Sequence, residues 1–118
     1  MKKDNVIRDK SYTFALRVVK LYQFLINEKK EFVLSRQILR SGTSIGANVE
    51  EAIGGQSGRD FQSKIAIAYK EARETHYWIR LLKGSDYLTD EHSQSILSDC
   101  EELMKILGSI QKTMKIRN

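Results

Sequence analysis

The sequence predicts an all-α protein, an up-down-up-down antiparallel four-helix bundle that forms a single domain over residues 1–118. Three observations predict this fold. Proline is absent, apolar residues recur at helical spacing throughout, and most glycines lie near the ends of the periodic segments. The predicted connections are only about five to eight residues long, and links that short join neighbouring helices in antiparallel order.

The first two predicted helices cover residues 6–28 and 36–53. Ser35 is the expected N-cap of the second helix, because a serine hydroxyl can accept a free N–H of the first turn. Gly54 and Gly55 are expected to end that helix in a left-handed conformation. The predicted core stripes repeat at steps of four and three residues: Phe14, Val18, Leu21 and Leu25, then Ile38, Gly42, Ile45, Val49 and Ala52.

The third and fourth predicted helices cover residues 59–83 and 90–115. Ser57 and Thr89 are their expected N-caps, and Gly84 is expected to end the third helix. The predicted core stripes are Phe61, Ile65, Ala68, Ala72, Thr75, Ile79 and Leu82, then Ile96, Cys100, Leu103, Leu107, Ile110 and Met114.

Composition excludes several classes of protein. No apolar run approaches the roughly 20 residues of a membrane span, and the charged N-terminus does not resemble a signal peptide. The single cysteine, Cys100, excludes an internal disulfide and a cysteine-based zinc site. We therefore expect a cytoplasmic protein with no cofactor.

A basic face on the third helix is the candidate for binding nucleic acid. The net charge of +5 permits such a partner without requiring one. Four cations and a tyrosine fall within an arc of about 80° on a helical wheel, where cations could contact phosphates while a base stacks on the ring. The alternative is a solvated face with intrahelical pairs such as Lys70–Glu74. The predicted binding residues are Arg59, Lys70, Arg73, Tyr77 and Arg80, extended by Arg17 and Lys20 of the first helix.

Two helices carry large apolar residues away from their core stripes. Such residues predict a partner surface, and we expect self-association through a heterologous contact that closes into a ring. Glycines inside the second helix indicate a close approach of another backbone. The alternative for Trp78 is that it covers an edge of the bundle. The predicted interface residues are Leu16, Phe24, Gly42, Gly46, Ile67, Trp78 and Leu81.

The motifs in the sequence do not indicate an enzyme. A di-iron site in a bundle needs Glu-x-x-His on two helices, and the sequence contains no such motif. His76 follows Arg73 too closely for the Arg–His spacing of a helical ribonuclease, and Cys100 lies on a core stripe, where a thiol is inert. We expect no metal and no catalytic residue. Glu50, Glu71 and Glu74 are expected to pair with Arg40, Arg73 or a neighbouring subunit.

Two segments carry a family resemblance. Ser-Arg-Gln-Ile-Leu-Arg-Ser-Gly-Thr-Ser-Ile-Gly-Ala-Asn-Val-Glu-Glu-Ala at 35–52 and Lys-Glu-Ala-Arg-Glu-Thr at 70–75, with Trp78, resemble the bacterial four-helix-bundle family encoded in intervening sequences of 23S rRNA genes, the so-called S23 ribosomal proteins. That family is related to the accessory variability protein of diversity-generating retroelements. The resemblance implies a homopentamer and, more weakly, binding to RNA or DNA and a reverse transcriptase as protein partner. It implies no activity, since most of the family is of unknown function.

Two hypotheses follow from these observations. The first is a non-enzymatic, ring-forming bundle that binds nucleic acid through phosphate contacts without reading base sequence. The alternative is a scaffold for protein interaction and assembly that does not bind nucleic acid. Steep salt dependence of nucleic-acid binding would distinguish the first from the second.

Overall fold

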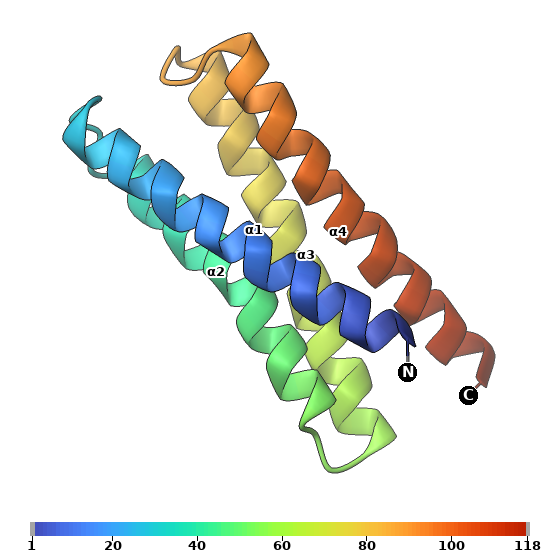
Figure 1. Cartoon of the computed structure of the whole chain (residues 1–118). Coiled ribbons are helices and arrows are strands. Elements are labelled where there is room, and N and C mark those ends of the chain that lie inside the picture. Colours follow the sequence, from blue (N-terminus) through green and yellow to red (C-terminus); the bar gives the residue numbers. More distant parts are fainter. Residues whose placement is uncertain (1, 118) are drawn as a thin grey trace.

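Four helices make up the chain in a computed structural model that describes residues 2–117, with side chains described for residues 6–115. They are α1 (Lys2–Asn27), α2 (Leu34–Ile53), α3 (Gly58–Gly84) and α4 (Asp90–Arg117). Consecutive helices run antiparallel, which confirms the predicted all-α bundle (Figure 1). None of the described helices is long and apolar enough to cross a membrane.

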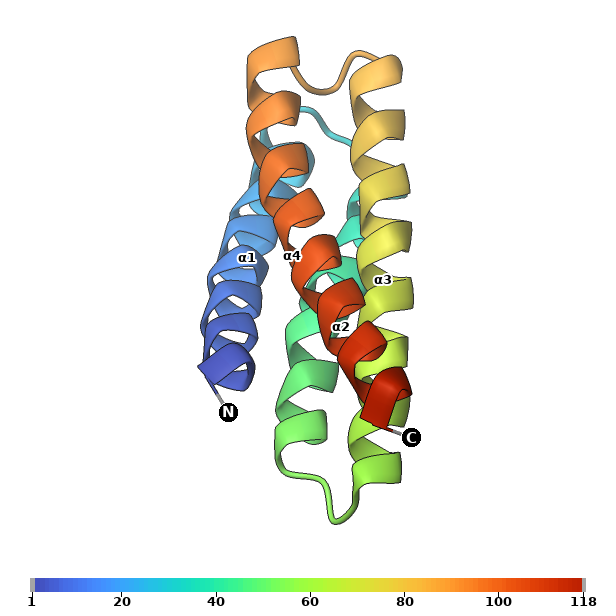
Figure 2. The ribbon, with the colours of Figure 1, turned by 90° about the vertical axis from the view of Figure 1, so that its right-hand side faces the viewer.

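The helices occupy the four corners of a rod of 46 × 21 × 19 Å. α2 adjoins α1 and α3, α4 adjoins α3 and α1, and the backbones of the diagonal pairs stay apart. The α1–α4 seam is the loosest of the four, because these two helices cross at an angle (Figures 1 and 2). The outward faces of α1 and α3 therefore point in opposite directions.

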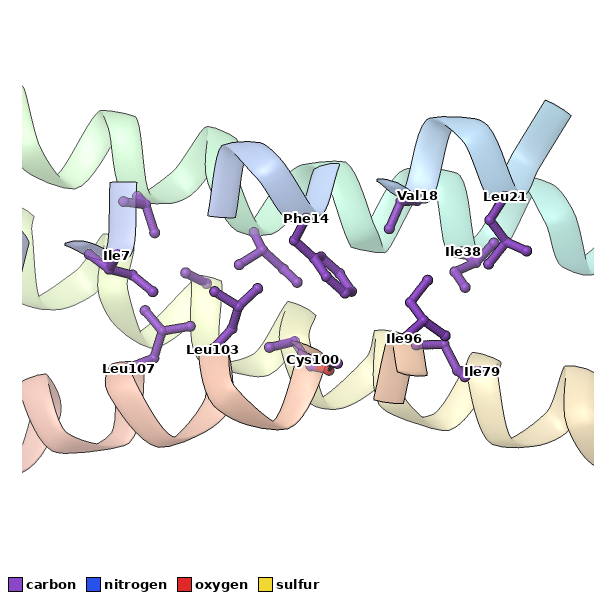
Figure 3. Packing of buried hydrophobic residues seen from close by; sticks show 14 of the residues in the cluster. Ile7, Phe14, Val18, Leu21, Ile38, Ile79, Ile96, Cys100, Leu103 and Leu107 are labelled. Carbon is purple, nitrogen blue, oxygen red and sulfur yellow. Dashed lines mark hydrogen bonds between the residues drawn. The ribbon is translucent and has the colours of Figure 1, made fainter. Parts of the chain in front are cut away.

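The core is formed by the predicted stripes. All nine predicted core residues of α1 and α2 are buried, while Phe61 and Met114 are only partly buried at the ends of their stripes. Figure 3 shows Ile7 and Phe14 of α1 pointing towards Leu103 and Leu107 of α4 across the interior. The two stripes meet there because steps of four and three keep apolar side chains on one side of each helix.

Gly42 and Gly46 are buried between α1 and α2. A Cβ atom at Gly42 would lie 2.7 Å from a methyl carbon of Val18, and one at Gly46 would lie 3.3 Å from the carbonyl oxygen of Ser11. The predicted close approach of a second backbone is therefore confirmed at Gly46, whereas the neighbour of Gly42 is the Val18 side chain, and both neighbours belong to α1 of the same chain. The expected place of both glycines in an oligomer interface is wrong, because α1 covers them.

The start of α2 differs from the prediction. Ser35 lies inside the helix, and its hydroxyl donates to the carbonyl oxygen of Glu31 at 2.7 Å. The cap is the buried Glu31 carboxylate, which accepts the backbone N–H groups of Val33, Leu34 and Ser35 at 3.3, 3.1 and 2.7 Å. The positive end of the helix dipole also stabilises an acidic side chain at this place.

The other predicted helix ends are mostly correct. Ser57 accepts the backbone N–H of Asp60, and Thr89 accepts that of His92, each at 3.1 Å. Gly54 does follow α2, but its φ of −83° is not left-handed. Among the described residues other than glycine, Lys30 and Asp86 have positive φ. Lys30 lies in the α1–α2 connection and Asp86 in the α3–α4 connection.

Replacing Gly42 by alanine should destabilise the fold. The new methyl group would overlap the stiff, β-branched Val18, and overpacking of a core costs about 1–3 kcal/mol, against a gain of about 1 kcal/mol in helix propensity. Urea unfolding followed by circular dichroism measures the difference. Gly84→Ala is the matched control, since nothing lies within 4 Å of its new methyl group. A Gly42→Ala protein as stable as Gly84→Ala would contradict this packing argument.

Candidate nucleic-acid interface

Four exposed cations on α3 have no ion-pair partner among the residues whose side chains the structure describes. They are Arg59, Lys70, Arg73 and Arg80. Other cations of the chain do pair: Lys10 with Glu102, Lys64 with Glu51 and Lys83 with Asp90, to name three. The predicted basic face on α3 therefore keeps its positive charge unneutralised by neighbouring side chains.

The alternative interpretation was a solvated face with intrahelical pairs such as Lys70–Glu74, and this pair does not form. Glu74 is engaged on the other side, where it accepts hydrogen bonds from Arg40 of α2 and from the indole nitrogen of Trp78, the latter at 3.0 Å. Arg40 also donates to Glu71 at 2.8 Å. The predicted pairing of Glu71 and Glu74 with Arg40 is confirmed, and it leaves Lys70 without this partner.

Tyr77 lies among these cations and is 48% exposed. The ring of Trp78 meets it edge-on, with centroids 5.2 Å apart and planes inclined by 68°. The guanidinium carbon of Arg80 lies 5.7 Å from the centroid of the tyrosine ring. Tyr77 is thus an exposed aromatic surface that two neighbouring side chains contact.

Two of the four cations, Arg73 and Arg80, lie on the outward face of α3 close to α4. Tyr69 packs beside Gly108 of α4, and His76 contacts a glutamate of α4 at 3.0 Å. Arg73 and Arg80 follow these two residues by one helical turn, so they emerge along the same edge. An open hollow of about 480 Å³ lies on this edge of the bundle; it is lined by Tyr69, Glu101, Met104 and Lys105.

The exposed apolar residues of α3 lie towards α2. Ile67 precedes Glu71 by one turn, Trp78 follows Glu74 by one turn, and both glutamates bind Arg40 of α2. Ile67 is 39% exposed, whereas Trp78 is half-buried and packs against the core. This placement of Trp78 agrees with the interpretation that it covers an edge of the bundle.

The expected extension of the basic face onto α1 does not form within one chain, and the role of Lys20 stays a prediction. Arg17 donates to Asp99 and Ser95 of α4, both at 2.7 Å, and thereby ties α1 to α4. Lys20 is exposed, but α1 lies diagonally opposite α3 and does not contact it. Neither cation can join the α3 face within one chain.

The predicted apolar face of α1 is only partly present. Leu16 is half exposed, as expected, and Tyr12 beside it is more exposed still. Phe24 is instead partly buried against the core, with its ring edge-on to His92 of α4 at 6.0 Å. The apolar pattern of α1 did not reveal this contact, because α4 also covers residues of α1 that lie outside the predicted core stripe.

The search for catalytic chemistry gives two structural facts. The described residues contain no group of three or more His, Cys, Asp or Glu side chains that could hold a metal ion. Burial raises the pKa of the Cys100 thiol to about 12, and its sulfur lies 3.3 Å from a carbonyl oxygen of α3. A thiol with that pKa is almost entirely protonated near neutral pH, which makes it a poor nucleophile.

Sequence reasoning missed Tyr69 and Lys105, which line the hollow beside the basic face. Lys105 is exposed and has no ion-pair partner among the described residues. The signal that could have located this edge is Gly108, the one glycine in the sequence of α4, against which Tyr69 packs.

Comparisons with known proteins agree with the sequence resemblance. Residues 3–109 match the family model described as 23S rRNA-intervening sequence protein. A crystal structure of a protein with unknown function from the S23 ribosomal protein family of Bacteroides thetaiotaomicron VPI-5482 is 58% identical, with a TM-score of 0.92. The similarity covers 93% of this chain and 98% of that one. No curated protein matches the chain.

Loss of the Glu74 carboxylate should lower stability at neutral pH and have no effect in acid. The hydrogen bond from Trp78, aided by Arg40, holds the pKa of Glu74 below its usual value against the effect of burial. Such a carboxylate stabilises the fold above its unfolded pKa of about 4.3, and the contribution disappears as pH falls through the folded value.

Urea unfolding of wild type and Glu74→Gln at pH 7, 4.5 and 3 measures this contribution. We expect a difference below about 1 kcal/mol at pH 7, because solvent screens the group, shrinking to zero at pH 3. Glu50→Gln is the control, because Glu50 is exposed and forms no ion pair with the side chains described in the structure, contrary to the pairing expected from the sequence. A pH-independent difference would mean that the Glu74 charge does not stabilise the fold.

Proposed function

This chain belongs to the 23S rRNA-intervening sequence protein family, and on that premise we propose that it is a non-enzymatic, ring-forming protein that binds nucleic acid. In this proposal the protein contacts phosphates and does not read base sequence. The observation that carries the proposal is the set of four exposed cations on α3 that lack an ion pair with any side chain of residues 6–115.

The length of the basic face suits a phosphate backbone. Arg59 and Arg80 are separated by about 30 Å along α3, at a rise of 1.5 Å per residue. Each cation that neutralises a phosphate releases condensed counterions, so binding of such a face weakens steeply with salt. No ion pair with a described side chain fixes the orientation of these cations, as reading one base edge would require. The face therefore favours recognition without sequence readout.

Ring formation is supported by two exposed apolar sites on different corners of the bundle. Leu16 lies on α1, and Ile67 and Leu81 lie on α3, diagonally across the rod. Two different surfaces that bind each other form a heterologous contact, which closes into a ring when the rotation between subunits allows it. The resemblance noted above is the basis for proposing five subunits.

An assembly scaffold is the second candidate, and one observation favours it. Phe32 and Val33 are 51% and 70% exposed in the connection between α1 and α2, apart from both apolar sites. Two exposed apolar residues at one end of the rod offer a contact for a protein partner. A reverse transcriptase is the partner that the family resemblance suggests.

Reversing two charges on α3 should abolish nucleic-acid binding. Arg73→Glu with Arg80→Glu replaces two cations by carboxylates, so the phosphates lose two attractive contacts and meet repulsion instead. We expect at least a tenfold loss of affinity in fluorescence anisotropy at low salt, with the oligomer and fold unchanged. The wild-type affinity should fall steeply as salt rises.

Lys20→Glu with Arg36→Glu is the matched control, since it changes net charge equally at exposed positions of α1 and α2. That variant should bind as the wild type does. Equal loss in both variants would indicate a general effect of net charge, and binding that survives in the α3 variant would remove this face from the interface.

The heterologous contact can be tested by mixing two variants. Leu16→Asp and Ile67→Asp should each dissociate the ring to monomers of 13.6 kDa, because each destroys one of the two surfaces. An equimolar mixture retains one intact surface of each kind, so it should form dimers and no larger species. Light scattering measures the masses. A ring that persists in either variant, or a mixture that stays monomeric, would contradict the pairing of α1 with α3.

A further inference from the structure

We propose that the nucleic acid on α3 is single-stranded, with one base stacked on the ring of Tyr77. The inference rests on the proposed function and specifies the class of ligand. It starts from an aromatic side chain that is 48% exposed and surrounded by cations without ion pairs.

Duplex recognition would leave Tyr77 unused. A helix reads duplex DNA by entering the major groove, which is about 12 Å wide. α3 is flanked by α2 and α4 in a rod whose cross-section is 21 × 19 Å, so it cannot enter a groove of that width. A duplex could touch the cations with its outer phosphates only, while its bases stay stacked inside.

A single strand can use the tyrosine and the cations together. Its bases are free to turn out, and stacking on an aromatic ring does not depend on base identity. The edge-on contact with Trp78 and the guanidinium of Arg80 restrict the ring, so little rotamer freedom remains to be lost on stacking.

The adjoining hollow between α3 and α4 supplies a path for the backbone. Tyr69, Met104, Lys105 and Glu101 line it, and the Glu101 carboxylate contacts His76 of α3 at 3.0 Å. Arg73 lies one turn along α3 from Tyr69, at the edge of this hollow. Arg73 of α3 and Lys105 of α4 therefore lie at this hollow, about two helical turns along α3 from Tyr77, where they can contact the backbone of a strand whose base stacks on the ring.

Fluorescence anisotropy with three probes at low salt tests the inference. The probes are an oligouridine and an oligodeoxythymidine of about twelve nucleotides, and a mixed-sequence DNA duplex of the same length. We expect both single strands to bind about tenfold more tightly than the duplex. Stacking on tyrosine needs no 2′-hydroxyl, so RNA and DNA should bind alike, and single-strand binding should quench the fluorescence of Trp78, the one tryptophan of the chain.

Two substitutions at the exposed ring separate stacking from charge. Tyr77→Leu should weaken single-strand binding about tenfold, because stacking of one base is worth roughly 1–3 kcal/mol, and leave duplex binding within about twofold. Tyr77→Phe keeps the ring and should retain wild-type affinity for the single strands. Circular dichroism confirms that both variants fold.

The outcomes distinguish this inference from the function on which it rests. Equal binding of duplex and single strands, unchanged in Tyr77→Leu, would overturn the stacking assignment while phosphate binding stands. Binding of only one of the two single strands would replace stacking by a sugar-specific contact and overturn it as well. No binding to any probe would overturn the proposed function and this inference together.

Discussion

The close approach of α1 and α2 is the constraint on which the rest of the bundle depends. At Gly42 a methyl group would meet the Val18 side chain, and at Gly46 it would meet the backbone at Ser11, so the two helices pack closely along this seam. This contact fixes α2 in place. The opposite side of α2 then presents Arg40 and the buried Ser41 hydroxyl, 2.8 Å from Thr75, to α3.

Charges divide the surface into paired seams and an unpaired face. The acidic stretch in the first half of α4 meets cations or a histidine of its neighbours, as Asp99 does with Arg17 and Glu101 with His76. On the α2 side, Arg40 forms ion pairs with Glu71 and Glu74 of α3. The outward cations of α3 lie beyond these acids, so folding neutralises the seams and leaves one helix basic.

Periodicity was sufficient to predict the bundle and its core, because residues three and four apart necessarily share a helix face. It could not identify the cap of α2, since Glu31 acts through a carboxylate that precedes the helix and Ser35 resembles an ordinary cap. The basic face of α3 could be predicted because its cations lie on one arc of a helical wheel. Arg17 was misassigned because a single helix does not show which neighbour will supply Asp99.

The order of the helices around the rod also bears on how the chain folds. The tight seams join helices that follow one another in the sequence, and the one seam between distant segments, α1 with α4, is the loosest. Low contact order of this kind is associated with folding in microseconds to milliseconds. Closure of α1 against α4 then requires the largest loop, so this seam is expected to form last and to open first.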